Sequence, residues 1–102
     1  MSHMRHNAII ATASKAQAMT ALVEYARSLG AEVIVGGEVT NAYVTACITP
    51  DGSKEGWQTS KDGDERRTKI KTWLRNHPEN FEWCEVAYGD DDEKARITDS
   101  AW

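Results

Sequence analysis

The stretch SKAQAMTALVEYARSLG, residues 14–30, carries the clearest structural signal in the chain. Its apolar residues recur at steps of three and four, the spacing that gathers them on one side of a helix. Ser14 and Gln17 have the spacing of a capping box, and Gly30 can adopt the left-handed conformation that ends a helix. We therefore predict an amphipathic helix over residues 14–30, whose apolar side needs a sheet to pack against.

Length and composition are those of one globular domain. The chain has 102 residues, of which 40% are hydrophobic and 27% charged, enough to form a core without disulfides or metals. No apolar run approaches the ~20 residues that cross a bilayer, so we expect no contact with a membrane. We interpret residues 1–4 as the remnant of an expression tag, 5–98 as a single α+β domain and 99–102 as a frayed tail.

The remaining segments predict strands around this helix and one further helix. A second helix is expected from Asp62, which forms a capping box with Glu65, to His77. Alternation and β-branched residues predict four strands and a possible fifth that buries Ala95 and Ile97; these strands span residues 6–12, 32–39, 43–49, 81–88 and 93–98. The turn before the third strand falls at Thr40-Asn41, or alternatively at Gly36-Gly37.

The resulting order, β-α-β-β-α-β, is that of a ferredoxin-like fold. In this α+β arrangement two helices pack on one face of an antiparallel sheet, whose other face is open or covered by a partner. An α+β roll with one helix fewer is the alternative.

The strand over residues 81–88 offers two apolar faces, and its assignment decides where a partner would bind. If Cys84, Val86 and Tyr88 face the helices, then Phe81 and Trp83 lie uncovered on the opposite face. Exposed aromatic residues grouped on a sheet indicate a partner surface or a dimer interface. The alternative is that the C-terminal strand and Trp102 cover them.

Charge is distributed unevenly along the chain. The net charge is −4, which disfavours a general nucleic-acid binder. Residues 54–75 carry seven basic against four acidic residues, whereas residues 79–93 carry seven acidic residues and no basic one. We expect the acidic turn to contact a basic partner, and the basic helix to be the surface of any nucleic-acid function.

The candidate residues follow from these patterns. For a protein partner or a second copy of the chain they are Tyr43, Phe81, Trp83, Asp90, Asp91 and Asp92. For the nucleic-acid alternative they are Lys69, Lys71 and Arg75. Catalytic residues, a metal site and a cofactor are not predicted, because the acids lack the spacing of a calcium loop and no glycine-rich phosphate loop is present. The two cysteines, Cys47 and Cys84, are expected to be buried free thiols of a protein in the reducing cytoplasm.

Between Asp51 and Asp91 the chain is similar to small uncharacterised proteins of tailed bacteriophages and prophages. The motifs that carry the resemblance are DGSKEGW, DGDERR, KTWL and W-x-EVAYGDD. The resemblance implies a phage origin, and hence the cytoplasm of a host cell, rather than an activity. Because such accessory proteins often bind and block host proteins, it favours our hypothesis of a small non-enzymatic protein-binding module over the nucleic-acid alternative. No site residue is implied by it.

Overall fold

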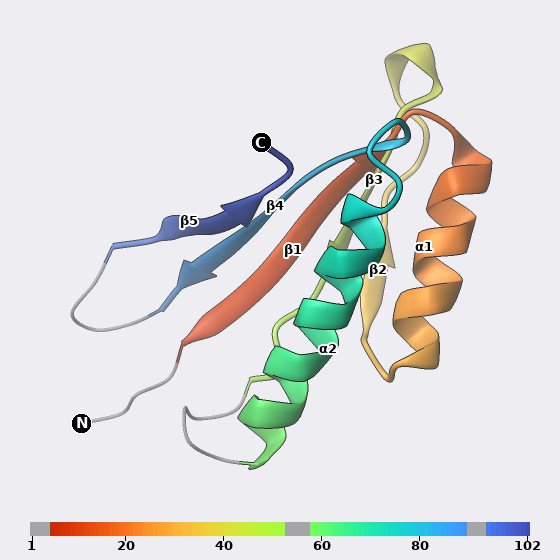
Figure 1. The fold of residues 1–102 in the computed structure, drawn as a ribbon. Coiled ribbons are helices and arrows are strands. Elements are labelled where there is room, and N and C mark those ends of the chain that lie inside the picture. The colour runs from red at the N-terminus through yellow and green to blue at the C-terminus, as the bar shows by residue number, and fades with distance from the viewer. Residues whose placement is uncertain (1–4, 53–57, 90–93) are drawn as a thin grey trace.

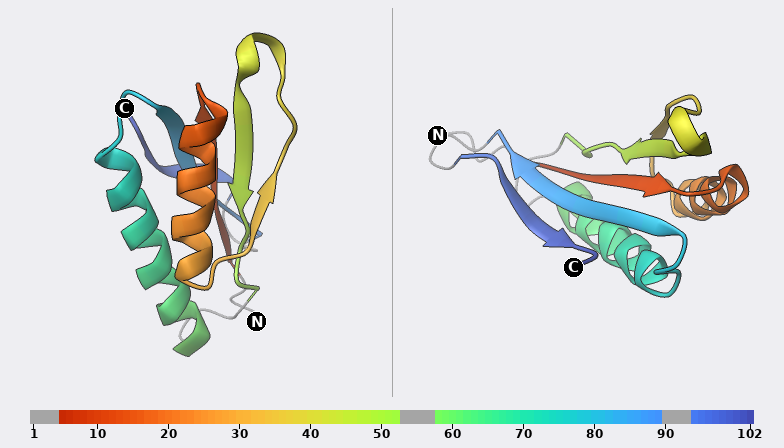
Figure 2. Two further views of the ribbon diagram at one scale, coloured as in Figure 1. Left: turned by 90° about the vertical axis from the view of Figure 1, so that its right-hand side faces the viewer. Right: turned by 90° about the horizontal axis from the view of Figure 1, so that it is seen from above.

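A five-stranded antiparallel sheet with two helices on one face forms the domain (Figures 1 and 2). The computed structural model describes residues 5–52, 58–89 and 94–102, and the predicted tag at 1–4 lies outside them. The strand order is β2-β3-β1-β4-β5. The predicted α+β class and the antiparallel sheet are confirmed. In chain order the elements are β1 (His6–Ala13), α1 (Ala16–Ser28), β2 (Val33–Val35), η1 (Thr40–Ala42), β3 (Val44–Ile48), α2 (Gln58–Arg75), β4 (Phe81–Tyr88) and β5 (Arg96–Ser100).

α1 packs on the sheet through the apolar side that its sequence predicts, and its buried residues are Met19, Leu22, Val23 and Ala26. The predicted capping box is wrong, because Lys15 occupies the N-cap and makes no side-chain capping bond. The predicted end is confirmed by Gly30, whose φ is 88°. The amides of Gly30 and Ala31 donate to the carbonyl oxygens of Arg27 and Ala26, so the last turn satisfies its own acceptors.

β1 and β3 lie under the centre of the core, and their successive side chains alternate between the two faces of the sheet. β1 lies between β3 and β4, and its apolar residues occupy both of its faces. Toward the helices the two strands bury Ile9, Ala11, Ala13, Val44, Ala46 and Ile48. Along β3 the buried residues are therefore every second one, as the alternation that predicts the strand requires.

The hairpin between β2 and β3 turns at η1, as the first of the two predicted positions requires. Asn41 has a φ of 66°, a left-handed conformation that asparagine tolerates. Pairing continues beyond Gly36-Gly37, because the amide of Val39 donates to the carbonyl oxygen of Tyr43. The alternative turn at the glycine pair is therefore wrong.

α2 begins one turn earlier than the sequence indicates. The side chain of Gln58 donates to Asp62 over 3.0 Å within the helix, so the capping box predicted at Asp62 is wrong. Further along, Ile70 and Leu74 are fully buried against the sheet, as their spacing predicts.

Gly63 extends α2 across a position where a side chain does not fit. A Cβ built on Gly63 would lie 2.0 Å from Oδ2 of Asp51, in the loop after β3. Asp51 in turn pairs with Arg67, one turn further along the helix, at 3.6 Å. Glycine therefore allows Asp51, in the loop after β3, to approach the helix backbone.

The prediction for the two faces of β4 is wrong, because Phe81 and Trp83 are only 4% and 6% exposed. Both side chains pack under α2: Trp73 meets Phe81 edge-on with ring centroids 5.5 Å apart, and the guanidinium of Arg75 lies 4.9 Å from the centroid of Trp83. The free energy gained by burying two large aromatic side chains outweighs the gain from burying the alternate residues Cys84, Val86 and Tyr88. Neither residue is available to a partner.

β5 also differs from its prediction. Ala95 and Ile97 are exposed rather than inward, because the register of β5 shifts by one residue at a bulge opposite Glu85 and Val86. The expected frayed tail is wrong at its start, since Asp99 belongs to the strand.

We predict that Gly63→Ala lowers the free energy of unfolding by roughly 1–3 kcal/mol, although alanine is the better helix former, because the methyl group displaces Asp51. Urea denaturation measures the change. In an Asp51→Ala background the same substitution should stabilise the protein by up to about 1 kcal/mol, the ordinary helix preference. An equal loss in both backgrounds would contradict the steric explanation.

Candidate binding surface

The face of the sheet turned away from the helices carries a continuous row of apolar side chains. Ile10 pairs with Cys47 on one side and Cys84 on the other, and Cys47 pairs with Ile34 on the neighbouring strand. A second pair, Val86 and Ile97, lies next to this row. We call these residues the open-face strip: Ile10, Ile34, Cys47, Cys84, Val86 and Ile97.

The open-face strip is accessible in the part of the chain that the structure describes. Ile97 is 67% exposed, Ile34 60% and Ile10 41%. An antiparallel sheet with helices on one face ordinarily presents polar residues on the other. Here the apolar residues stand at the middle of the face, where a hydrated surface would carry polar ones.

The two ends of this face differ from its centre. At one end Thr12 and Thr45 share a hydrogen bond of 2.8 Å, and Glu82 pairs with Thr12 on the other side. At the opposite end the rings of His6 and Tyr88 lie 5.2 Å apart. The surface is therefore apolar in the middle, acidic at one end and aromatic with an imidazole at the other.

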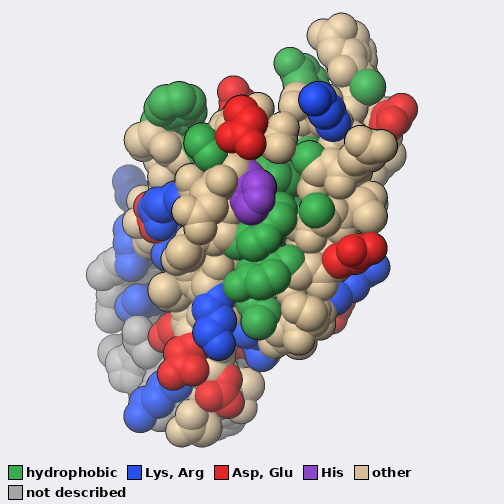
Figure 3. Space-filling model, turned by 45° about the vertical axis from the view of Figure 1, so that its right-hand side comes forward, with side chains coloured by type: hydrophobic (Ala, Val, Ile, Leu, Met, Phe, Trp, Pro, Cys, Tyr) green, Lys and Arg blue, Asp and Glu red, His purple; other side chains and the backbone are tan. Residues whose placement is uncertain are grey.

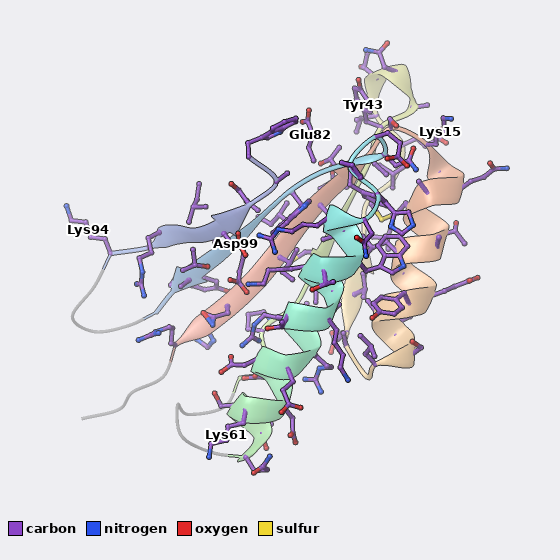
Figure 4. All side chains as sticks on the ribbon, in the orientation of Figure 1. Lys15, Tyr43, Lys61, Glu82, Lys94 and Asp99 are labelled. Atoms are coloured by element: carbon purple, nitrogen blue, oxygen red, sulfur yellow. The ribbon has the colours of Figure 1, made fainter. Side chains whose placement is uncertain are left out.

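A cavity of about 350 Å³ opens at the acidic end of the sheet. Figure 4 shows Tyr43 and Glu82 at this end, and both line the cavity together with Trp102, which is 97% exposed. Its volume lies within the range of ligand pockets. Trp102 does not cover the sheet, so the predicted alternative in which it covers Phe81 and Trp83 is wrong.

Of the residues predicted to contact a partner, Tyr43 is exposed on this surface at 44%. Phe81 and Trp83 are in the core, and Asp90, Asp91 and Asp92 lie outside the described residues. Ile10 and Ile34 are not among the residues predicted from the sequence. The consecutive Ile9 and Ile10 contain the signal, because they force one isoleucine onto each face of a central strand.

Cys47 and Cys84 are free thiols, as predicted, but they are only partly buried. Both belong to the open-face strip and flank Ile10 on the central strand. The prediction that they lie in the core is wrong, because the inward sets of β3 and β4 are the alternate residues.

On the helix side of the sheet, a cluster of charged side chains joins α2 to β4 and β5. Glu85 and Arg67 are each 7% exposed. The carboxylate of Glu85 lies 3.6 Å from Nε of Arg67 and 3.1 Å from Nζ of Lys71, and it accepts a 2.8 Å hydrogen bond from Thr98. A buried carboxylate needs such partners, because an unpaired charge in the interior costs several kcal/mol.

The cluster continues outward to Asp99. Arg75 donates to one oxygen of Asp99 at 2.5 Å, and Lys71 lies 3.2 Å from the other. The hydrogen bond from Arg75 is the main cause that lowers the pKa of Asp99 to about 2; burial opposes it, and the hydrogen bond from Lys71 adds to the lowering. These cations hold β5 to the helix.

This cluster uses two of the three residues of the nucleic-acid alternative. Lys71 and Arg75 are paired with Glu85 and Asp99, and Lys69 and Arg75 are exposed. A phosphate would have to compete with carboxylates already in place. The outer face of α2 therefore offers a weak phosphate site.

Arg67 also lies between two smaller cavities. It contacts Asp51 at 3.6 Å and Asp64 in the preceding turn, so acids surround it. The cavities measure about 230 and 160 Å³, below the ~300 Å³ at which ligand pockets begin. Among the residues of known placement, no cluster of histidine, cysteine and acids has the arrangement of a metal site.

The seam between the two helices is apolar at the surface and filled by its own rings (Figure 3). Trp73 stacks on Tyr25 at 5.8 Å and on His77 at 4.1 Å. Nδ1 of His77 donates to the carbonyl oxygen of Trp73 over 2.7 Å. These rings pack against one another and so fill the seam.

We predict that Asp99→Asn lowers the free energy of unfolding at neutral pH by about 1 kcal/mol, because Arg75 and Lys71 lose a charged partner. The folded-state pKa is lowered from 3.8 to about 2, so the carboxylate stabilises the fold above about pH 4 and loses this effect as the pH falls toward 2. The difference between the proteins should shrink over that interval in urea titrations. Glu24→Gln on the exposed side of α1 is the control, and a difference that persists at pH 2 would contradict the assignment.

No helix in the described residues is both long and apolar enough to cross a bilayer. No family model matches the chain, and no curated protein or solved structure is significantly similar to it.

Proposed function

We propose that this chain is a small protein-binding module, rather than an enzyme, and that it contacts its partner through the open-face strip. The observation that carries the proposal is the exposure of Ile10, Ile34 and Ile97 on one sheet face. Exposed apolar area costs about 25 cal/mol per Å² relative to burial, and large contiguous apolar patches on soluble domains mark interaction sites.

The chemistry of this face favours a protein over the other classes of ligand. Its centre is flat and uncharged, which suits the apolar core of a protein interface. A nucleic acid would need accessible cations, whereas Lys71 and Arg75 are paired with acids. The nucleic-acid alternative therefore rests on Lys69 alone among its three residues.

We also propose that the domain is ferredoxin-like, with β5 as an addition. The order β2-β3-β1-β4 supports this assignment, since it brings β1 beside β3 and β4 as in a split βαβ unit. The resemblance of residues 51–91 to phage proteins supports an accessory role in the cytoplasm of a host cell, where the module would bind a host protein or a copy of itself.

The adjacent residues Ile34 and Val35 provide a matched test. They lie on opposite faces of β2 and are 60% and 41% exposed. We predict that Ile34→Lys reduces capture of partner proteins from a lysate of the source organism by about tenfold or more, because it places a charge in the interface. Val35→Lys, on the helix side, should leave capture unchanged.

Quantitative mass spectrometry of the captured proteins makes the comparison, and circular dichroism establishes that both variants are folded. Equal capture by Ile34→Lys and the unsubstituted protein would exclude the open-face strip as the binding surface.

A further inference from the structure

We propose that the occupant of the open-face strip is a second copy of this chain, packed face to face with its strands running in the opposite direction. This inference rests on the proposed function, because it assumes that the open face is an interface. It adds the identity of the partner and the orientation in which the partner binds.

The dimensions of the face are close to those of a dimer interface. The five strands, spaced about 4.8 Å apart, contain three to eight residues and are roughly 10–27 Å long. The face therefore covers roughly 450 Å² on each copy, and the pair about 900 Å², near the lower limit of about 1,000 Å² for a specific interface.

Among the described residues, the polar groups at the two ends of the open face complement each other when one copy is reversed. On β1 and β4, the two longest strands, the ionisable groups besides the thiol and the phenol are His6 and Glu82, and they occupy opposite ends. A two-fold axis across the strands places His6 of each copy near Glu82 of the other, where the imidazole can donate to the carboxylate. An axis along the strands would instead bring Glu82 against Glu82, which repel.

The shape of the two ends supports the same orientation. The paired rings of His6 and Tyr88 stand at one end, and the cavity of about 350 Å³ lined by Tyr43, Glu82 and Trp102 opens at the other. Reversal sets the ring pair of one copy at the cavity of the next. The apolar centres, which contain Ile10, then meet in the middle of the interface.

Sedimentation equilibrium of the full chain tests the occupant. We expect a monomer–dimer equilibrium whose Kd rises about a hundredfold with Ile10→Lys, because each interface then buries two ammonium groups at its centre. Val35→Lys is the control, since Val35 is 41% exposed and lies on the helix side of β2. Its Kd should not change.

Charge reversal tests the orientation. His6→Glu and Glu82→Lys should each raise the Kd about tenfold, because both copies then face a like charge or lose a pair. The double variant His6→Glu, Glu82→Lys should return the Kd to within a few-fold of the original, since reversed copies again pair unlike charges. Copies aligned in the same direction would not recover, and a double variant as weak as the singles would overturn the antiparallel arrangement.

Sedimentation and the capture experiment together distinguish a failure of this inference from a failure of the proposed function. A protein that stays monomeric at about 1 mM, where even weak dimers associate, overturns the second copy as occupant. If Ile34→Lys nevertheless abolishes capture of another protein, the proposed function stands. If Ile34→Lys changes neither capture nor self-association, both are overturned.

Discussion

The buried contact between Glu85 and the cations of α2 is a constraint that the packing of the helices on the sheet must satisfy. A carboxylate in the interior is unfavourable unless it is paired and hydrogen-bonded, and Arg67 and Lys71 supply the pairing from one helix face. Once Glu85 points inward, the period of two along β4 brings Trp83 in with it and turns Val86 outward. The ion-pair cluster and the burial of Phe81 and Trp83 thus favour the same face of β4 as the inward one.

The same cluster explains why the two surfaces of the protein have different chemistry. α2 is rich in basic residues, yet Arg75 and Lys71 neutralise acids of β4 and β5, so the helix does not present a uniformly positive face. The opposite side of the sheet contains few charges and retains Ile10 at its centre. The apolar face, rather than the charged helix, is therefore where an association would remove most apolar area from water.

Local patterns predicted much of the fold. The apolar side of α1, the left-handed Gly30 and the alternation of β3 depend on neighbours within a few residues, and all three are confirmed. The prediction for the faces of β4 is wrong because α2 decides it from outside the local pattern: Trp73 packs on Phe81, and Lys71, fourteen positions earlier, pairs with Glu85. The candidate binding surface differs from the predicted one for the same reason. Its predicted aromatic residues, Phe81 and Trp83, belong to the core, and its isoleucines can be placed only once the inward-facing residues of each strand are known.

The two thiols of the open-face strip have a consequence for how the protein oxidises. Cys47 and Cys84 pair with Ile10 from opposite sides, so their Cα atoms are separated by two strand spacings, about 10 Å. A disulfide requires Cα atoms within about 7 Å, which the rigid central strand prevents. Any disulfide that either thiol forms in the folded state must therefore cross-link separate molecules, and air oxidation would convert a reversible contact into a covalent one.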